Sequence, residues 1–186
     1  MKCLPLFVLL FSLINAQPPP LDDDNLERMI WAARLSRSSA FPGAAAQEEP
    51  FHPQYFRYIE DKVNAILLGF RLDRCFVSFK ANAGEFESFW QLLKPFDKEI
   101  CQRNDSSQCC KTRSGNFEAY TKPAIYDEFQ TAVQECTAFC SDPDECLILL
   151  GLSQGASLAI IAGIDLIDLN PRVYTFGAVT GLDKKC

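Results

Sequence analysis

The hydrophobic positions from residue 55 onward change period along the chain, and each period predicts a different element. Apolar residues at helical spacing predict helices over 55–68, 86–93, 126–140 and 155–168. Short continuous apolar runs predict strands over 75–79, 146–150 and 172–176. Residues 97–118 are polar and rich in cysteine without either period, which predicts a loop. Helices that alternate with continuously apolar strands indicate an α/β fold with a buried parallel sheet.

The first sixteen residues have the pattern of a secretory signal peptide. Lys2 precedes an apolar run from Leu4 to Ile14, and Ala16 is a small residue suited to cleavage. The run is shorter than the roughly 20 residues that a membrane-spanning helix needs. We therefore predict a secreted, extracellular protein with a signal peptide over 1–16 and no transmembrane segment.

Residues 17–50 are a poor candidate for a packed core, because they combine a proline run, three consecutive aspartates and a stretch of small and acidic residues. Such composition predicts a flexible N-terminal segment, with a short helix over 26–35 as an alternative within it. The folded domain is then expected over 51–186.

Composition narrows the class of protein and of partner. A chain of 186 residues, 48% of them hydrophobic, is suited to one domain with a sizeable core. The formal net charge of −6 argues against nucleic acid or an anionic membrane as an electrostatic partner. It does not argue against a neutral lipid or ester.

The cysteines predict a disulfide framework, because cleavage after Ala16 leaves an even number in a secreted chain. No C-x-x-C pair occurs and the chain has one histidine, so we expect no metal site and no cofactor. Cys136 and Cys140 are one helical turn apart and are expected to bond different partners. Cys186 is expected to pair within the chain or with another chain, and Asn104-Asp105-Ser106 is an N-glycosylation sequon. The connectivity stays open among Cys75, Cys101, Cys109, Cys110, Cys136, Cys140, Cys146 and Cys186.

The strongest functional signal is the segment Gly151-Leu152-Ser153-Gln154-Gly155, which lies between the predicted strand 146–150 and the predicted helix 155–168. A strand, a tight G-x-S-x-G turn and a helix form a nucleophile elbow, which holds a serine clear of a strained backbone. The alternative interpretation is a small residue at a tight strand-to-helix turn. In the elbow, the N–H of the following residue, Gln154, is available to a developing oxyanion.

The elbow and three further windows of the sequence are similar to segments of one known family and occur in the same order. GLSQGASLAIIAG at the elbow is similar to G-H-S-L-G-G-A-L-A, and VYTFG at 173–177 is similar to a strand that ends in T-F-G. CFVSFKANAGEFESFW at 75–90 resembles V-x-F-R-G-T followed by a helix, and SGNFEAY at 114–120 resembles G-F-x-x-A-Y. Together these windows resemble the class 3 (fungal-type) lipases.

The resemblance implies an α/β-hydrolase fold, with a mostly parallel central sheet flanked by helices, and hydrolysis of acylglycerol esters without a cofactor. Ser153 matches the nucleophile, and Gln154 matches the residue that supplies one oxyanion N–H. Asn82 falls on the Thr/Ser position of F-R-G-T, which supplies the second donor.

The sequence also departs from the family pattern. Leu152 occupies the position of the elbow histidine, and no residue matches the family's catalytic acid or base, which implies a domain incomplete at the C-terminus. The one histidine, His52, precedes the first core element and is predicted to lie in a surface loop. Asp165 and Asp168 are predicted to be solvated or capping residues, and Asp183 does not match the family's acid.

Three interpretations follow from these departures, and the first has two forms. The chain is a truncated product of a longer active lipase, or it is a shortened relative with impaired catalysis. The rival is a non-catalytic, secreted, disulfide-rich module that binds lipid or protein. A third interpretation is that the chain does not fold stably alone, because strand 172–176 would lie at a sheet edge.

Overall fold

The structure is a computed structural model, and it describes residues 55–60, 64–81, 94–102, 105–178 and 182–183. Its centre is a five-stranded sheet in the order β1-β2-β3-β6-β7. The strands are β1 (Phe56–Glu60), β2 (Asn64–Arg71), β3 (Arg74–Ala81), β6 (Leu147–Leu152) and β7 (Arg172–Phe176).

The sheet is mixed, because β1, β2 and β3 pair antiparallel whereas β3, β6 and β7 pair parallel. This arrangement confirms the α/β class, and the antiparallel half is the part that the continuous apolar runs did not predict. The strands predicted over 75–79, 146–150 and 172–176 are confirmed as β3, β6 and β7.

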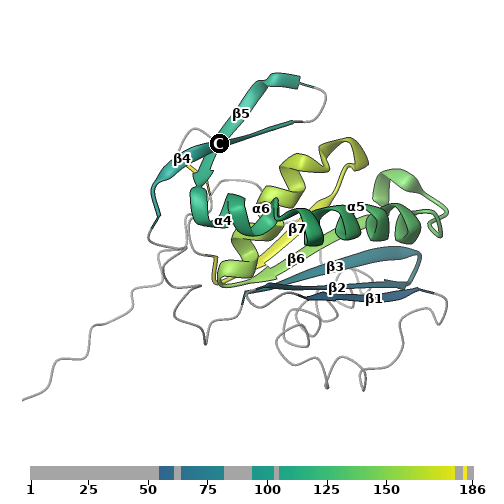
Figure 1. The fold of residues 1–186 in the computed structure, drawn as a ribbon. Coiled ribbons are helices and arrows are strands. Elements are labelled where there is room, and N and C mark those ends of the chain that lie inside the picture. The colour runs from purple at the N-terminus through teal and green to yellow at the C-terminus, as the bar shows by residue number, and fades with distance from the viewer. Residues whose placement is uncertain (1–54, 61–63, 82–93, 103–104, 179–181, 184–186) are drawn as a thin grey trace, which may run out of the picture.

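The described helices pack on one face of this sheet. They are α4 (Ser114–Tyr120), α5 (Pro123–Thr137) and α6 (Gln154–Asp165), and Figure 1 shows all three on the same side of the strands. Alternate strand side chains such as Val77, Phe79 and Leu149 join Phe129 and Ile161 of the helices in the main core. A smaller cluster on the opposite face contains Leu67, Phe76, Ile148 and Leu150. Both faces of the central strands are therefore apolar, which explains their continuous hydrophobic runs.

The two predicted helices over 126–140 and 155–168 are confirmed as α5 and α6. Pro123 opens α5, where a missing N–H costs nothing. The second helix ends at Asp165, and a short 3-10 turn, Ile167–Leu169, follows before β7. No helix within the described residues is long and apolar enough to span a membrane. The predicted elements over 1–16, 17–50, 26–35 and 86–93 lie outside the described residues.

The helix predicted over 55–68 is wrong, because that segment belongs to the antiparallel strands β1 and β2. Residues 65–68 are buried on both faces of the sheet, so their apolar run fits a helix face and an inner strand equally well. A tight turn at Leu72 and Asp73, with φ of 51° and 57°, joins β2 to β3. Two consecutive positive φ values characterise the type I′ hairpin turn, but Leu72-Asp73 is not one of the Asn-Gly, Asp-Gly or Gly-Gly pairs that signal it in sequence.

The loop predicted over 97–118 is also wrong. Strands β4 (Phe96–Gln102) and β5 (Asp105–Arg113) form a separate antiparallel hairpin, which Figure 1 shows beyond the helical layer, and α4 follows directly. Within β4 only Ile100 is buried, so the strand has no apolar alternation to mark it. Leu182 forms a β-bridge with Thr112, which brings the described C-terminal residues alongside β5.

Disulfides connect these elements. The bonded pairs are Cys75–Cys136, Cys101–Cys109 and Cys140–Cys146, and Cys110 is disulfide-bonded as well. The first joins β3 to α5, the second closes the β4–β5 hairpin, and the third closes the turn between α5 and β6. The prediction that Cys136 and Cys140 have different partners is confirmed. Cys186 and the sequon at Asn104 lie outside the described residues.

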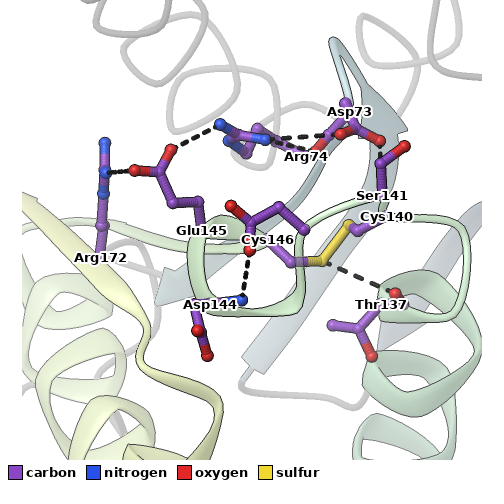
Figure 2. A network of polar contacts seen from close by, with 10 residues as sticks. Asp73, Arg74, Thr137, Cys140, Ser141, Asp144, Glu145, Cys146 and Arg172 are labelled. Carbon is purple, nitrogen blue, oxygen red and sulfur yellow. Dashed lines mark hydrogen bonds and ion pairs between the residues drawn. A yellow bond between two sulfur atoms is a disulfide. The ribbon is translucent and has the colours of Figure 1, made fainter.

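A polar network fixes the amino ends of the parallel strands (Figure 2). Glu145 accepts a hydrogen bond of 2.8 Å from Arg74 at the start of β3 and forms an ion pair of 2.9 Å with Arg172 at the start of β7. Asp73 accepts the N–H of Ser141 at 2.9 Å. These contacts anchor β3, β6 and β7 at the end of the sheet opposite Ser153.

Tyr55, the residue before β1, connects this strand to the helical layer, because its hydroxyl donates a hydrogen bond to the carbonyl of Ala132 in α5. Burial, with a contribution from Glu135, raises the pKa of Tyr55 to about 12. The phenol therefore stays protonated and remains a donor at neutral pH.

Candidate active site

The site begins with the backbone between β6 and α6. Ser153 has φ 57° and ψ −120°, and it is one of four described residues other than glycine with positive φ. Such a conformation costs roughly 1–3 kcal/mol and persists where the surroundings enforce it. Here the Ser153 N–H donates to the carbonyl of Phe176 in β7 at 2.9 Å, and its own carbonyl accepts the Ala156 N–H at 3.1 Å. The turn is thus held from both sides while Ser153 remains exposed.

The glycines of the motif are required by the close approach of strand and helix. A Cβ on Gly151 would lie 2.2 Å from the carbonyl oxygen of Gly155 and 2.5 Å from Cα of Ala156. Those atoms belong to the first turn of α6, so β6 and α6 touch through their backbones. This contact supports Ser153 from beneath and fixes its direction.

Negative charge beside Ser153 would be stabilised by the start of α6. Gln154 is the first residue of this helix and is 3% exposed. The first N–H groups of a helix lack acceptors within it, and they form the positive end of the helix dipole. An oxyanion next to Ser153 would therefore meet favourable donors, as acyl transfer requires.

The immediate surroundings of the turn include exposed apolar surface. Leu152, the residue before Ser153, is 45% exposed and pairs in register with Phe176. A histidine at this position would offer a polar ring, whereas leucine offers an apolar side chain to a bound molecule.

The other residues that the sequence analysis considered for the site do not lie beside Ser153 in the part of the chain that the structure describes. Asn82 and His52 lie outside the described residues. Asp168 is exposed, as predicted. Asp183 is half-buried beside β5, where its N–H donates to the Lys111 carbonyl at 2.9 Å. Among the residues that the structure describes, no group of three His, Cys, Asp or Glu is placed to hold a metal ion.

The prediction that Asp165 is a solvated or capping residue is wrong. Its carboxylate accepts hydrogen bonds from the Tyr120 hydroxyl at 2.7 Å, the Tyr126 hydroxyl at 3.0 Å and the Gln130 amide at 2.9 Å. Asp165 therefore fastens the end of α6 to α4 and α5. About 16 Å of helix, at 1.5 Å per residue, separates it from Gln154, so it does not reach Ser153.

We predict that Asp165→Asn lowers the free energy of unfolding by about 2 kcal/mol, because hydrogen bonds to a charged acceptor contribute about 1.5–3 kcal/mol. Urea unfolding followed by circular dichroism measures it. Asp168→Asn, at an exposed position, is the control and should change stability by less than about 0.5 kcal/mol. Equal effects of the two variants would contradict the structural role of Asp165.

A cavity of about 350 Å³ lies away from the elbow, between β1 and α5. Its charged lining includes Arg57, Asp127, Glu128 and Glu135, and Arg57 forms an ion pair of 3.7 Å with Glu135. Charged walls do not suit an acyl chain, and β1 is separated from β6 by two strands. The cavity is therefore not part of the candidate site.

Comparison with known proteins agrees with this geometry. A family profile described as "Lipase (class 3)" matches residues 76–185, more than half of the 186 residues. Among solved structures, the triacylglyceride lipase of Rhizomucor miehei is similar, with a TM-score of 0.59 and 12% sequence identity over 89% of this chain. This chain spans 66% of the length of that lipase, and at such identity the likeness concerns the fold alone. A search of curated protein sequences finds no significant match.

Proposed function

The chain belongs to the class 3 lipase family, and on that basis we propose that it hydrolyses carboxylic esters of the acylglycerol type through Ser153. The observation that carries the proposal is the conformation of Ser153, exposed at φ 57° between a buried strand and a helix start. A serine with only a packing role gains nothing from a strained, exposed position.

In the proposed reaction the Ser153 Oγ attacks the ester carbonyl carbon, and its proton passes to a base. The carbonyl oxygen becomes an oxyanion, which the N–H of Gln154 and, from the family resemblance, the N–H of Asn82 stabilise. Collapse breaks the bond to the alkoxy oxygen, which takes up the proton held by the base and leaves as the alcohol, and an acyl ester remains on Ser153. Water then attacks this ester and releases the carboxylic acid.

We propose that these 186 residues, taken by themselves, are an impaired catalyst. A serine hydroxyl is a weak nucleophile without a neighbouring base, and removal of a triad member costs several orders of magnitude in rate. The chain contains one histidine, His52, which precedes the domain core in sequence, and no residue after Ser153 matches the family's acid or base. The rate that remains would come from substrate binding and oxyanion stabilisation.

The proposal extends to substrate and location. The exposed Leu152 beside Ser153 favours an apolar ester over a charged substrate. The signal-like residues 1–16, the sequon at Asn104 and the disulfides support export to an oxidising, extracellular environment.

Labelling with a fluorescent alkyl phosphonate tests the nucleophile directly. We expect slow labelling at Ser153, supported by the oxyanion donors but not by a matched base, and we expect Ser153→Ala to lose this label entirely. Ser141→Ala is the matched control, because Ser141 is an exposed serine in a loop at the opposite end of β6, and this variant should be labelled like the unmodified chain.

Two results would contradict the proposal. Equal labelling of Ser153→Ala and the unmodified chain would exclude Ser153 as the activated group. No labelling of any variant, with folding verified by circular dichroism, would favour the non-catalytic module that binds lipid or protein.

A further inference from the structure

Two disulfides lie side by side at the amino ends of the parallel strands. Cys75–Cys136 joins β3 to α5, and Cys140–Cys146 closes the turn between α5 and β6. The N–H of Cys75 donates to the carbonyl of Cys146 at 2.9 Å, and all four cysteines belong to the main core or pack against it. The two bonds are therefore neighbours, but they differ in how far a reagent in solution can reach them.

Access to the sulfur atoms separates the two bonds. Cys75 and Cys136 are fully buried, so a thiolate in solution reaches neither sulfur while the domain is folded. Cys146 is buried as well, but Cys140 is half-buried, and exposed residues precede and follow it in the chain. Thiol–disulfide exchange depends on access to the sulfur that is attacked. Cys140 is thus the sulfur through which the second bond can be opened.

Polar contacts hold the turn between α5 and β6 independently of its disulfide (Figure 2). The N–H of Ser141 donates to Asp73 at 2.9 Å, and Glu145 binds the first residues of β3 and β7. The Asn170 side chain donates to a carbonyl of the same turn at 3.0 Å. The bonded cysteines are only 6 apart in sequence, so opening this loop releases little chain entropy. We therefore expect the reduced turn to keep its place, with both sulfurs close enough to bond again.

The buried sulfur of this pair has an acceptor suited to its reduced state. Sγ of Cys146 lies 3.8 Å from the carbonyl oxygen of Thr137, the last residue of α5 (Figure 2). A sulfur within a disulfide has no proton to donate, whereas a thiol is a weak donor. Reduction would convert this contact into an S–H···O hydrogen bond, so Cys146 would not become a buried donor without a partner.

We propose that Cys140–Cys146 is a redox-sensitive site, which a dithiol reduces in the folded domain while Cys75–Cys136 stays intact. A thiolate of the dithiol attacks Sγ of Cys140 and forms a mixed disulfide, and Cys146 leaves as a thiolate that takes up a proton. The second thiol of the reagent, as a thiolate, then attacks the mixed disulfide and releases Cys140, which also takes up a proton. The protein gains two electrons and two protons, and the dithiol is oxidised to a disulfide.

Reduction is expected to loosen the connection between α5 and β6. The amides of residues 138–146 should exchange with solvent faster in the reduced form, because the turn loses its covalent closure. Ser153 follows the other end of β6, so phosphonate labelling of Ser153 should not change. The redox site is thus independent of the proposed hydrolysis, and failure of one proposal leaves the other standing.

Differential alkylation of the folded 186-residue chain tests the proposal. The chain is incubated with a low concentration of dithiothreitol, free thiols are blocked with iodoacetamide, and the remaining disulfides are then reduced and blocked with a heavier reagent. We expect Cys140 and Cys146 to carry the first label together, at a rate at least about tenfold above that of Cys75 and Cys136. This neighbouring buried pair is the internal control. Peptide mass spectrometry assigns each cysteine separately, so reduction of the half-buried pair in the β4–β5 hairpin does not obscure the comparison.

Equal rates of labelling at the two pairs would overturn the proposal. A first label on Cys75 with Cys146 still bonded would overturn it too, because it would show exchange between the neighbouring disulfides. Circular dichroism follows the fold during the reduction. Labelling of Cys140 only in step with loss of the folded signal would also contradict the proposal, since the bond would then open only in the unfolded chain.

Discussion

Gly151→Ala is expected to lower the free energy of unfolding by about 3 kcal/mol or more, because overpacking into a rigid contact has a cost of this order. The added Cβ would lie 2.2 Å from the Gly155 oxygen, 2.4 Å from its carbonyl carbon and 2.5 Å from Cα of Ala156. All three are backbone atoms, so no rotamer change relieves the clash. The first turn of α6 must move away from β6.

The same displacement should disturb Ser153, since the turn is held between Phe176 of β7 and the first residues of α6. We therefore expect Gly151→Ala to reduce phosphonate labelling even at temperatures where the variant remains folded. Urea unfolding measures the stability, and labelling measures the site.

Gly163→Ala is the matched control in the adjoining helix. Its Cβ would meet only side-chain atoms, the closest being Cγ2 of the exposed Val173. The exposed Val173 must shift to admit this Cβ, and the cost of moving its β-branched side chain offsets the preference of about 1 kcal/mol for alanine over glycine in a helix interior. We expect a change in stability much smaller than that of Gly151→Ala. Equal destabilisation by the two substitutions would show that the contact beneath Ser153 is not rigid.

The carboxyl half of the domain could be predicted from its sequence because local and tertiary preferences agree there. The strand β6 is buried on both faces, and its apolar run ends at glycine, where the elbow needs close approach. The helix α6 and the strand β7 follow with few intervening residues. Each element is thus marked by its own composition and bounded by residues with a clear conformational role.

The amino half could not be predicted in the same way, because its elements depend on distant partners. Residues 65–68 have the same apolar pattern in a buried strand as on a helix face, and only pairing with β1 and β3 decides between them. The β4–β5 hairpin has little apolar pattern, and a disulfide, Cys101–Cys109, joins its strands. The period of the hydrophobic residues therefore says little about secondary structure in segments that contacts between strands stabilise.

In the candidate site as well, residues in a local motif could be predicted and a residue with distant partners could not. Ser153 and Gln154 were identified by a motif contained in a few consecutive residues. The role of Asp165 was missed because its partners, Tyr120, Tyr126 and Gln130, come from two other helices. The one signal in the sequence is an aspartate at the end of a mostly apolar helix. The sequence does not indicate that the two tyrosines and the glutamine contact this aspartate.

The Cys75–Cys136 disulfide is predicted to contribute the most stability of the three bonded pairs that the described residues define. The residues are 61 apart in sequence, against 8 for Cys101–Cys109 and 6 for Cys140–Cys146. By loop-closure entropy, the longest loop contributes about 4 kcal/mol and the shortest about 2 kcal/mol. Replacing Cys75 and Cys136 together with alanine should therefore lower the free energy of unfolding about twice as much as replacing Cys140 and Cys146.

Both cysteines of a pair must be replaced in this experiment. The N–H of Cys75 donates to the carbonyl of Cys146 at 2.9 Å, so the two disulfides are neighbours. A single substitution would leave a free thiol that can exchange with the adjacent bond. Urea unfolding of the two double variants, each verified by mass for its remaining disulfides, gives the comparison. Three of the four cysteines are buried and Cys140 is half-buried, so the packing lost differs mainly at that one side chain. Equal destabilisation would show that loop length does not determine the contribution.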